Sequence, residues 1–140
     1  MFKKLLVISI TTLVLVGCGK KEVTRSMLFG GWYCNSESTT SNYESINHKW
    51  FDINLGTKSF TLFLTSNKNM KQTDDSIVYI LDSDFKEKSS RAISIEDVIY
   101  TTTTEFVYIS ENKFKLIEDT FAPETKKSRM EAICTRITSK

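Results

Sequence analysis

Apolar and polar residues alternate along most of the chain after residue 30, and this alternation limits the fold more than any other feature. Residues 105–119, EFVYISENKFKLIED, contain two alternating runs joined by a short polar link. Successive side chains of a strand point to opposite faces, so two such runs with a tight connection are typical of a β-hairpin. No stretch with a helical period is longer than two turns. The pattern therefore predicts an all-β chain.

Polar turn residues divide the alternating runs, which are rich in β-branched and aromatic side chains. The runs predict about eight strands, near residues 31–36, 48–55, 58–65, 76–83, 91–101, 104–110, 113–119 and 128–137. The alternation changes phase near Glu96 and Asp97, where we expect a β-bulge. About eight short strands with short links fit a small antiparallel up-and-down barrel or a sandwich, and a closed barrel leaves no free strand edges.

The first seventeen residues have the layout of an export signal. Lys3 and Lys4 precede an apolar run over residues 5–16. The run has the length of a signal-peptide core and is too short to span a bilayer as a helix. It ends in Leu15-Val16-Gly17-Cys18, which resembles the lipobox of bacterial lipoproteins. The resemblance implies cleavage before Cys18 and fatty acylation of that cysteine; the alternative is an ordinary secretory signal.

The predicted lipid anchor indicates where the protein resides. One acyl chain binds a membrane reversibly, whereas several chains on one cysteine hold a protein there. Gly19 and Lys20 follow the cysteine, and in the lipoprotein sorting rule the absence of an aspartate there favours the outer membrane over the inner one. We expect a cell-envelope protein that faces the periplasm, with a signal peptide over 1–17, a lipidated tether over 18–27 and one β domain over 28–140.

Charge and residue content narrow the chemistry of the mature chain. The chain has 19 basic and 17 acidic residues, and the signal holds two basic residues and no acid, so 17 of each remain. This balance gives no field that would attract nucleic acid. The single histidine, His48, and the lack of a phosphate-binding loop argue against a metal, a cofactor or a catalytic triad. Adjacent acids such as Glu118 and Asp119 face opposite ways on a strand. We expect a non-enzyme.

Two cysteines remain after lipidation of Cys18. Cys34 shares a strand face with Trp32, and Cys134 shares one with Met130 and Ala132, so both are expected on the inner side. In an exported chain, such a pair predicts a disulfide between Cys34 and Cys134. The alternative is two unpaired buried thiols.

A short motif near the start of the β domain resembles a known family of barrels. In LFGGWYC, Gly30 and Trp32 are similar to the G-x-W motif with which lipocalin-like barrels begin. The resemblance implies a tryptophan that closes one end of the barrel and an internal cavity for an apolar ligand. The alternative is a small barrel filled by its own side chains.

The segment around Trp50 offers a candidate surface for a partner. Alternation in HKWFDINL places Phe51, Ile53 and Leu55 on one face, expected to be core, and His48, Trp50 and Asp52 on the other. His48 and Trp50 then point outward beside residues 36–47, which read as a polar loop containing Tyr43. Exposed aromatic residues often anchor protein partners. Trp50, His48 and Tyr43 are therefore the candidate binding residues; the alternative is that both faces are partly covered.

A second resemblance concerns function. WYC at 32–34 together with the late Cys134 is similar to the periplasmic lysozyme-inhibitor lipoproteins, although their S-G-x-x-Y inhibitory loop is missing. The resemblance implies a small lipidated barrel that binds a protein. The leading hypothesis is a non-catalytic binding protein, such as an inhibitor or an immunity factor against a periplasmic enzyme or toxin. The alternatives are a lipocalin-like carrier of a small apolar ligand and a structural accessory of an envelope complex.

Overall fold

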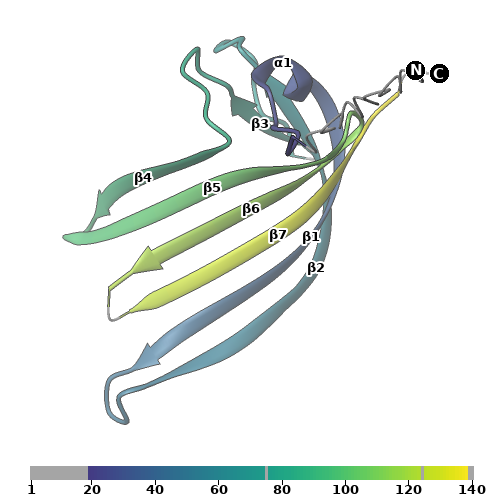
Figure 1. Ribbon diagram of the computed structural model, residues 1–140. Coiled ribbons are helices and arrows are strands. Elements are labelled where there is room, and N and C mark those ends of the chain that lie inside the picture. Colours follow the sequence, from purple (N-terminus) through teal and green to yellow (C-terminus); the bar gives the residue numbers. More distant parts are fainter. Residues whose placement is uncertain (1–18, 75, 124, 139–140) are drawn as a thin grey trace, which may run out of the picture.

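A computed structural model describes residues 19–74, 76–123 and 125–138. Within these ranges a four-residue helix precedes seven strands (Figure 1). The elements are α1 (Arg25–Leu28), β1 (Gly30–Glu44), β2 (Lys49–Thr65), β3 (Ser76–Ile80), β4 (Lys88–Ile95), β5 (Val98–Ser110), β6 (Lys113–Ala122) and β7 (Lys126–Arg136). The predicted all-β class is confirmed.

The strands form one curled sheet in the order β3-β2-β1-β7-β6-β5-β4. Neighbouring strands are antiparallel except β2 and β3, which are parallel. Figure 1 shows the sheet bent into a half-barrel, with α1 and β3 at one end and the β1–β2 hairpin reaching away from them. Because the described edge strands β3 and β4 do not pair, the sheet is a mixed half-barrel rather than a closed antiparallel barrel.

The predicted bulge at Glu96 and Asp97 is a hairpin turn instead. Both residues have positive φ angles, 48° and 64°, and they join Ile95 of β4 directly to Val98 of β5. Two central residues with positive φ form the tight turn that suits the twist of paired strands. The expected strand 91–101 is therefore two strands. The neighbouring threonines 101–104 lie inside β5 because β-branched side chains fit a strand.

Residues 36–47, expected to be a polar loop, belong mostly to a strand. β1 continues through Glu44, and its distal part pairs with β2 on one side and β7 on the other. The ladders satisfy backbone groups on both sides, so polar side chains do not end the strand here. The predicted strands 48–55 and 58–65 are likewise one strand, β2, with a register shift opposite Ser38 and Thr39.

The core occupies the inner face of the curl near α1. Trp32 and Phe114 are fully buried and meet edge to face, with ring centroids 4.6 Å apart. The Trp32 indole N–H donates a hydrogen bond of 2.8 Å to the carbonyl oxygen of Leu28. The Arg136 guanidinium stacks 4.2 Å from the Trp32 ring centroid. Large side chains thus fill the interior at this end.

Part of the predicted tether packs against the β domain. Val23 and Leu28 are buried in the core. The Val23 amide donates to a Glu87 carboxylate oxygen at 3.1 Å, and Arg25 donates to the Leu81 carbonyl at 2.9 Å. From Val23 onward the segment is therefore fixed to the sheet and to the loop that precedes β4. No helix of the described segments has the length and apolarity to cross a membrane.

Cys34 and Cys134 lie directly opposite each other on β1 and β7. Both side chains are fully buried on the inner face, as the alternation predicted. Their sulfur atoms are 2.01 Å apart, the distance of a disulfide bond. The register of the two strands therefore brings together residues that are 100 positions apart in the chain.

The half of the inner face beyond the core is open to solvent. Phe51 and Ile53 pair with Asn42 and Thr40, which alternate with the buried Cys34 along β1. They therefore lie on the inner face, as expected. The expectation that they and their neighbour Leu55 are core is wrong: their exposed fractions are 49%, 40% and, for Leu55, 55%. In the described part of the chain the second wall that would cover them is missing, because the sheet is only half closed.

Candidate functional site

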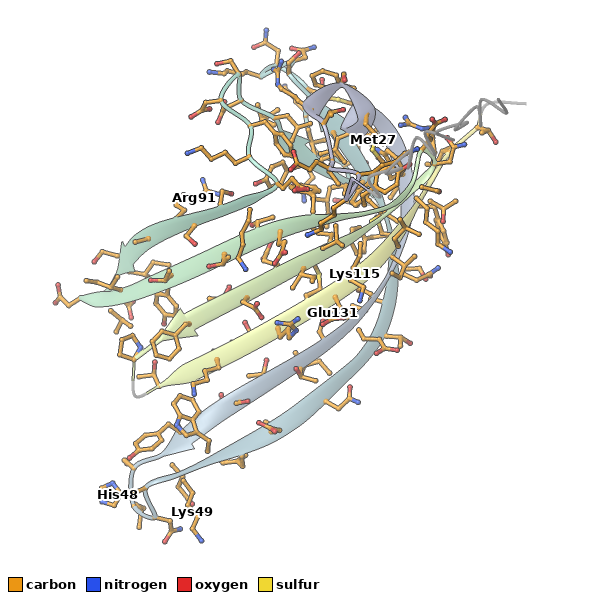
Figure 2. The ribbon with its side chains drawn as sticks, viewed as in Figure 1. Met27, His48, Lys49, Arg91, Lys115 and Glu131 are labelled. Carbon is orange, nitrogen blue, oxygen red and sulfur yellow. A yellow bond between two sulfur atoms is a disulfide. The ribbon has the colours of Figure 1, made fainter. Side chains whose placement is uncertain are left out.

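The three candidate residues meet at the tip of the β1–β2 hairpin. Figure 2 shows His48 and Lys49 at this tip, at the opposite end of the curled sheet from Met27 of α1. Tyr43 is the second-last residue of β1 on one side of the turn, and Trp50 is the second residue of β2 on the other. The hairpin therefore carries these side chains far from the packed core.

Cross-strand pairing places Tyr43 against Trp50. The two residues are partners in the β1–β2 register, and their ring centroids are 5.3 Å apart. Directly opposed aromatic side chains stabilise a strand pair by about 0.2–1 kcal/mol. Tyr43 also shares a hydrogen bond of 3.0 Å between its hydroxyl and Nδ1 of His48. His48 lies in the turn with a φ of 50°, in the left-handed region, and its ring contacts Tyr43.

Lys127 of β7 completes the cluster on the outer face. Its Nζ lies 4.3 Å from the Trp50 ring centroid and 5.8 Å from the Phe121 centroid. An ammonium held over an aromatic face is attracted by the ring quadrupole, by about 0.5–1 kcal/mol at an exposed site. We call Tyr43, His48, Trp50, Phe121 and Lys127 the distal cluster. His48, Phe121 and Lys127 are exposed, whereas Tyr43 and Trp50 are partly buried.

Sequence reasoning missed Lys127 and Phe121. Lys127 pairs with Phe121 on β6 and with Ser41 on β1, so its position beside Trp50 depends on the order of strands. The sequence gives no local signal of this order, because β7 is the last strand of the chain and pairs with the first. By contrast, Tyr43, His48 and Trp50 lie within eight positions and could be grouped from the sequence.

An ion-pair network adjoins the distal cluster on the outer face. Arg129 contacts Asp119 at 2.9 Å and Glu131 at 2.7 Å, and Lys115 lies 3.4 Å from Glu131. The hydrogen bond from Arg129 lowers the pKa of Glu131, with a further contribution from Lys115. The hydrogen bond to Glu131 raises the pKa of Arg129, and the charge of Asp119 adds to this. These four charged side chains pair with one another. The distal cluster therefore has more groups left to contact a partner than the ion-pair network has.

The titratable residues considered in the sequence lie in turns and on strand faces. His48 is bonded to Tyr43, and Glu96 and Asp97 form the β4–β5 turn. Glu118 pairs with Met130, whereas Asp119 pairs with Arg129, so the two acids lie on opposite faces as predicted. In the ranges that the structure describes, no three His, Cys, Asp or Glu side chains gather where they could hold a metal ion.

Cys18, the predicted lipidation residue, lies outside the described residues, and so do the other three residues of the lipobox-like motif. Gly30 and Trp32 stand at the start of β1, with Trp32 in the core. Compared with known proteins, the chain matches no family model and no curated sequence.

Proposed function

We propose that this chain is a lipid-anchored protein of the bacterial cell envelope that binds a periplasmic protein without catalysis. In this proposal it acts as an inhibitor or immunity factor against an enzyme or toxin. Cys18, acylated after removal of residues 1–17, supplies the anchor, and the distal cluster supplies the contact surface. The outer membrane is the favoured location because Gly19 and Lys20 follow the cysteine.

The distal cluster is the observation that supports this function. Its rings are positioned before any partner arrives, because Tyr43 and Trp50 oppose each other across a ladder and His48 is hydrogen-bonded to Tyr43. Side chains held in advance lose less conformational entropy on binding. Tryptophan and tyrosine are also among the residues that most often dominate binding energy at protein interfaces.

The position of the cluster fits an anchored protein. The buried Val23 lies five positions after Cys18, and a fully extended chain spans at most about 18 Å over five positions. Lipidation at Cys18 would thus keep the α1 end of the half-barrel close to the bilayer. The distal hairpin points away from α1 (Figures 1 and 2), so it would extend toward the periplasm.

Affinity capture from native membranes tests this function. The full protein, tagged at its C-terminus, is recovered with its bound molecules, which are identified by mass spectrometry. We expect one soluble enzyme or toxin, at least tenfold depleted by Trp50→Ala. Tyr33→Ala is the matched control, because Tyr33, like Trp50, is an outer-face aromatic residue; it is exposed and lies on β1 beside the packed core. Equal recovery with both variants would contradict a role for the distal cluster.

The open inner face supports a second candidate, a carrier of a small apolar ligand. Phe51, Ile53 and Leu55 on β2 and Ile93 and Ile95 on β4 are exposed. Exposed apolar groups on a concave surface favour an apolar ligand. In the same capture experiment, a bound lipid without a protein partner, lost on Ile53→Asp and kept on Trp50→Ala, would support the carrier instead.

A further inference from the structure

Strand β4 forms an exposed edge of the sheet. Along its eight residues it pairs with β5 alone among the described strands, and all eight are exposed. Its sequence, KSSRAISI, has no proline, and four of its eight side chains are small. Natural edge strands usually carry charges, prolines, bulges or covering segments, because a bare edge is a template for another strand, and Ala92, Ile93, Ser94 and Ile95 carry no charge and no proline. Lys88 and Arg91 are the charged residues on this edge.

The turn between β4 and β5 determines which backbone groups face outward. In a two-residue hairpin the flanking residues, here Ile95 and Val98, form a hydrogen-bonded pair, and such pairs alternate with non-bonded ones. The Phe106 amide donates a hydrogen bond of 2.7 Å to the Glu87 carbonyl, and Glu87 lies an even number of positions before Ile95. This bond therefore fits the same alternation of bonded and non-bonded pairs. The amides and carbonyls of every second residue therefore point away from β5. These residues are Lys88, Ser90, Ala92 and Ser94.

A groove runs beside the first half of this edge. It has a volume of about 490 Å³ and separates β3 from β4. Its lining comprises Val78, Tyr79 and Ile80 of β3, Asp82 of the loop after β3, Ser89, Ser90 and Arg91 of β4, and Thr102 and Thr104 of β5. Figure 2 shows Arg91 on β4, at the open side of the curl. The two edges of the half-barrel thus face each other across a gap.

The loop between β3 and β4 is hydrogen-bonded to the N-terminal segment, and these bonds leave the groove between the two strands open. The loop between β3 and β4 is bonded at Leu81 to the Arg25 guanidinium and at Glu87 to the Val23 amide. Both anchors belong to the buried N-terminal segment. They fix the two ends of the loop without pairing β3 to β4.

The side chains on the edge limit what would fit there. On the inner face Arg91, Ile93 and Ile95 lie in a row, and the two isoleucines are 45% and 55% exposed. Alternate side chains of an added strand would lie beside this row. Arg91 makes no ion pair with a residue in the described ranges, so a nearby acidic side chain would neutralise it. The outer face of the edge carries only Ser90, Ala92 and Ser94 between Lys88 and the turn.

From these observations we propose that the β4 edge and its groove bind an extended segment of a partner polypeptide as an eighth strand. The segment has apolar residues at alternate positions, opposite Ile93 and Ile95, and an acidic residue near Arg91. A single strand is favoured over a second copy of the sheet. A second β4 would bring its own β5 against the wall formed by Val78, Tyr79 and Ile80. This site is separate from the distal cluster.

Selection from a displayed library of random twelve-residue peptides tests the proposal with the full protein purified from membranes. We expect recovered peptides with alternating apolar residues and an acid. Hydrogen exchange should then show at least tenfold slower exchange of the amides of Lys88, Ser90, Ala92 and Ser94 when peptide is bound. Recovery of no peptide, or protection elsewhere in the chain, would overturn the proposal.

Ala92→Pro removes one outward-facing amide without removing a hydrogen bond to β5, and proline is tolerated on edge strands. We expect at least tenfold weaker peptide binding, whereas Ala92→Ser should stay within twofold.

The folding control is hydrogen exchange at the Ile93 amide, which bonds to β5. Protection of this amide in the Ala92→Pro variant shows that the β4–β5 ladder persists. If the protection is lost, the experiment uses Ser94→Pro in place of Ala92→Pro. Binding that is insensitive to the proline, or a dimer of the free protein that the proline abolishes, would contradict a partner segment at this edge. Trp50→Ala should leave peptide binding unchanged.

Discussion

Trp32 stabilises the packed end of the half-barrel through several contacts at once. It is fully buried, meets Phe114 edge to face, donates to the Leu28 carbonyl and lies under Arg136. We expect Trp32→Ala to lower the free energy of unfolding by about 3–5 kcal/mol, because it leaves a cavity and an unpaired carbonyl. Urea denaturation measures the change. Tyr33→Ala, at the exposed neighbouring position, should change it by less than about 0.5 kcal/mol. Similar losses for the two variants would contradict this account of the core.

Glu131 gives a stability contribution that depends on pH. Its pKa is lowered from 4.5 in the folded protein, chiefly by the hydrogen bond from Arg129. The unfolded chain therefore takes up a proton more readily, so the contribution is present above pH 4.5 and is lost as pH falls through the folded value. Glu131→Gln should cost up to about 1 kcal/mol at pH 7, since the pair is exposed, and less at pH 3.

Urea denaturation at both pH values measures that difference. Glu111→Gln is the control, because Glu111 lies in the β5–β6 turn without an ion pair in the described ranges. Its effect should not follow the same pH dependence. A Glu131→Gln deficit that persists or grows in acid would show that the carboxylate acts through packing rather than charge.

The β4–β5 hairpin depends on a turn with an unusual backbone conformation. Asp97 has a φ of 64°, which aspartate and glycine tolerate and β-branched residues do not. Asp97→Val should lower the free energy of unfolding by about 1–2 kcal/mol, whereas Asp97→Gly should be neutral within about 0.5 kcal/mol. Thermal melts with hydrogen exchange on β4 measure both changes. Equal stability of the valine and glycine variants would argue against this turn and for a bulge within one strand.

The same hairpin shows how far alternation predicts elements. A break of phase at Glu96 and Asp97 was visible in the sequence, but a bulge and a two-residue turn both produce it. The β5–β6 hairpin was predicted correctly because its two runs and its link are local. The distal part of β1 was missed because serine and threonine runs read as loop, although the ladders to β2 and β7 pair the backbone whatever the side chains are.

The candidate site was predictable only in its local part. Tyr43, His48 and Trp50 are close in the chain, so one hairpin brings them together. Lys127 joins them because β7 pairs with β1, and the exposure of Phe51 and Ile53 follows from the failure of the sheet to close. Both facts concern the order and curvature of the whole sheet. Alternation assigns side chains to faces, but it does not tell which faces are covered.

One long-range strand pairing, between β1 and β7, joins two groups of strands into the single sheet. β1, β2 and β3 come from the first part of the chain and β4 to β7 from the rest, and the sheet order joins these two groups only where β1 meets β7. Cys34 and Cys134 lie in that junction, opposite each other and fully buried. A bond between them spans 100 positions of the chain, and the loop closure cost that it removes from folding grows with loop length.

The disulfide should therefore govern the stability of the half-barrel as a unit. We compare the wild-type chain with a Cys34→Ala, Cys134→Ala double variant that keeps Cys18. In oxidised samples we expect the double variant to lose about 2–5 kcal/mol of unfolding free energy, whereas after reduction the two proteins should differ by less than about 1 kcal/mol. Urea denaturation with and without reductant measures both differences.

The reduced comparison separates the bond from the packing of its side chains. Alanine removes two buried sulfur atoms, so a deficit caused by lost packing would persist after reduction, whereas a deficit caused by the cross-link would disappear. If the oxidised proteins were equally stable, the thiols would be unpaired in solution and the β1–β7 ladder alone would join the two groups of strands. If the bond forms, Cys34→Ala alone should match the double variant, because either substitution leaves the same 100-residue loop open.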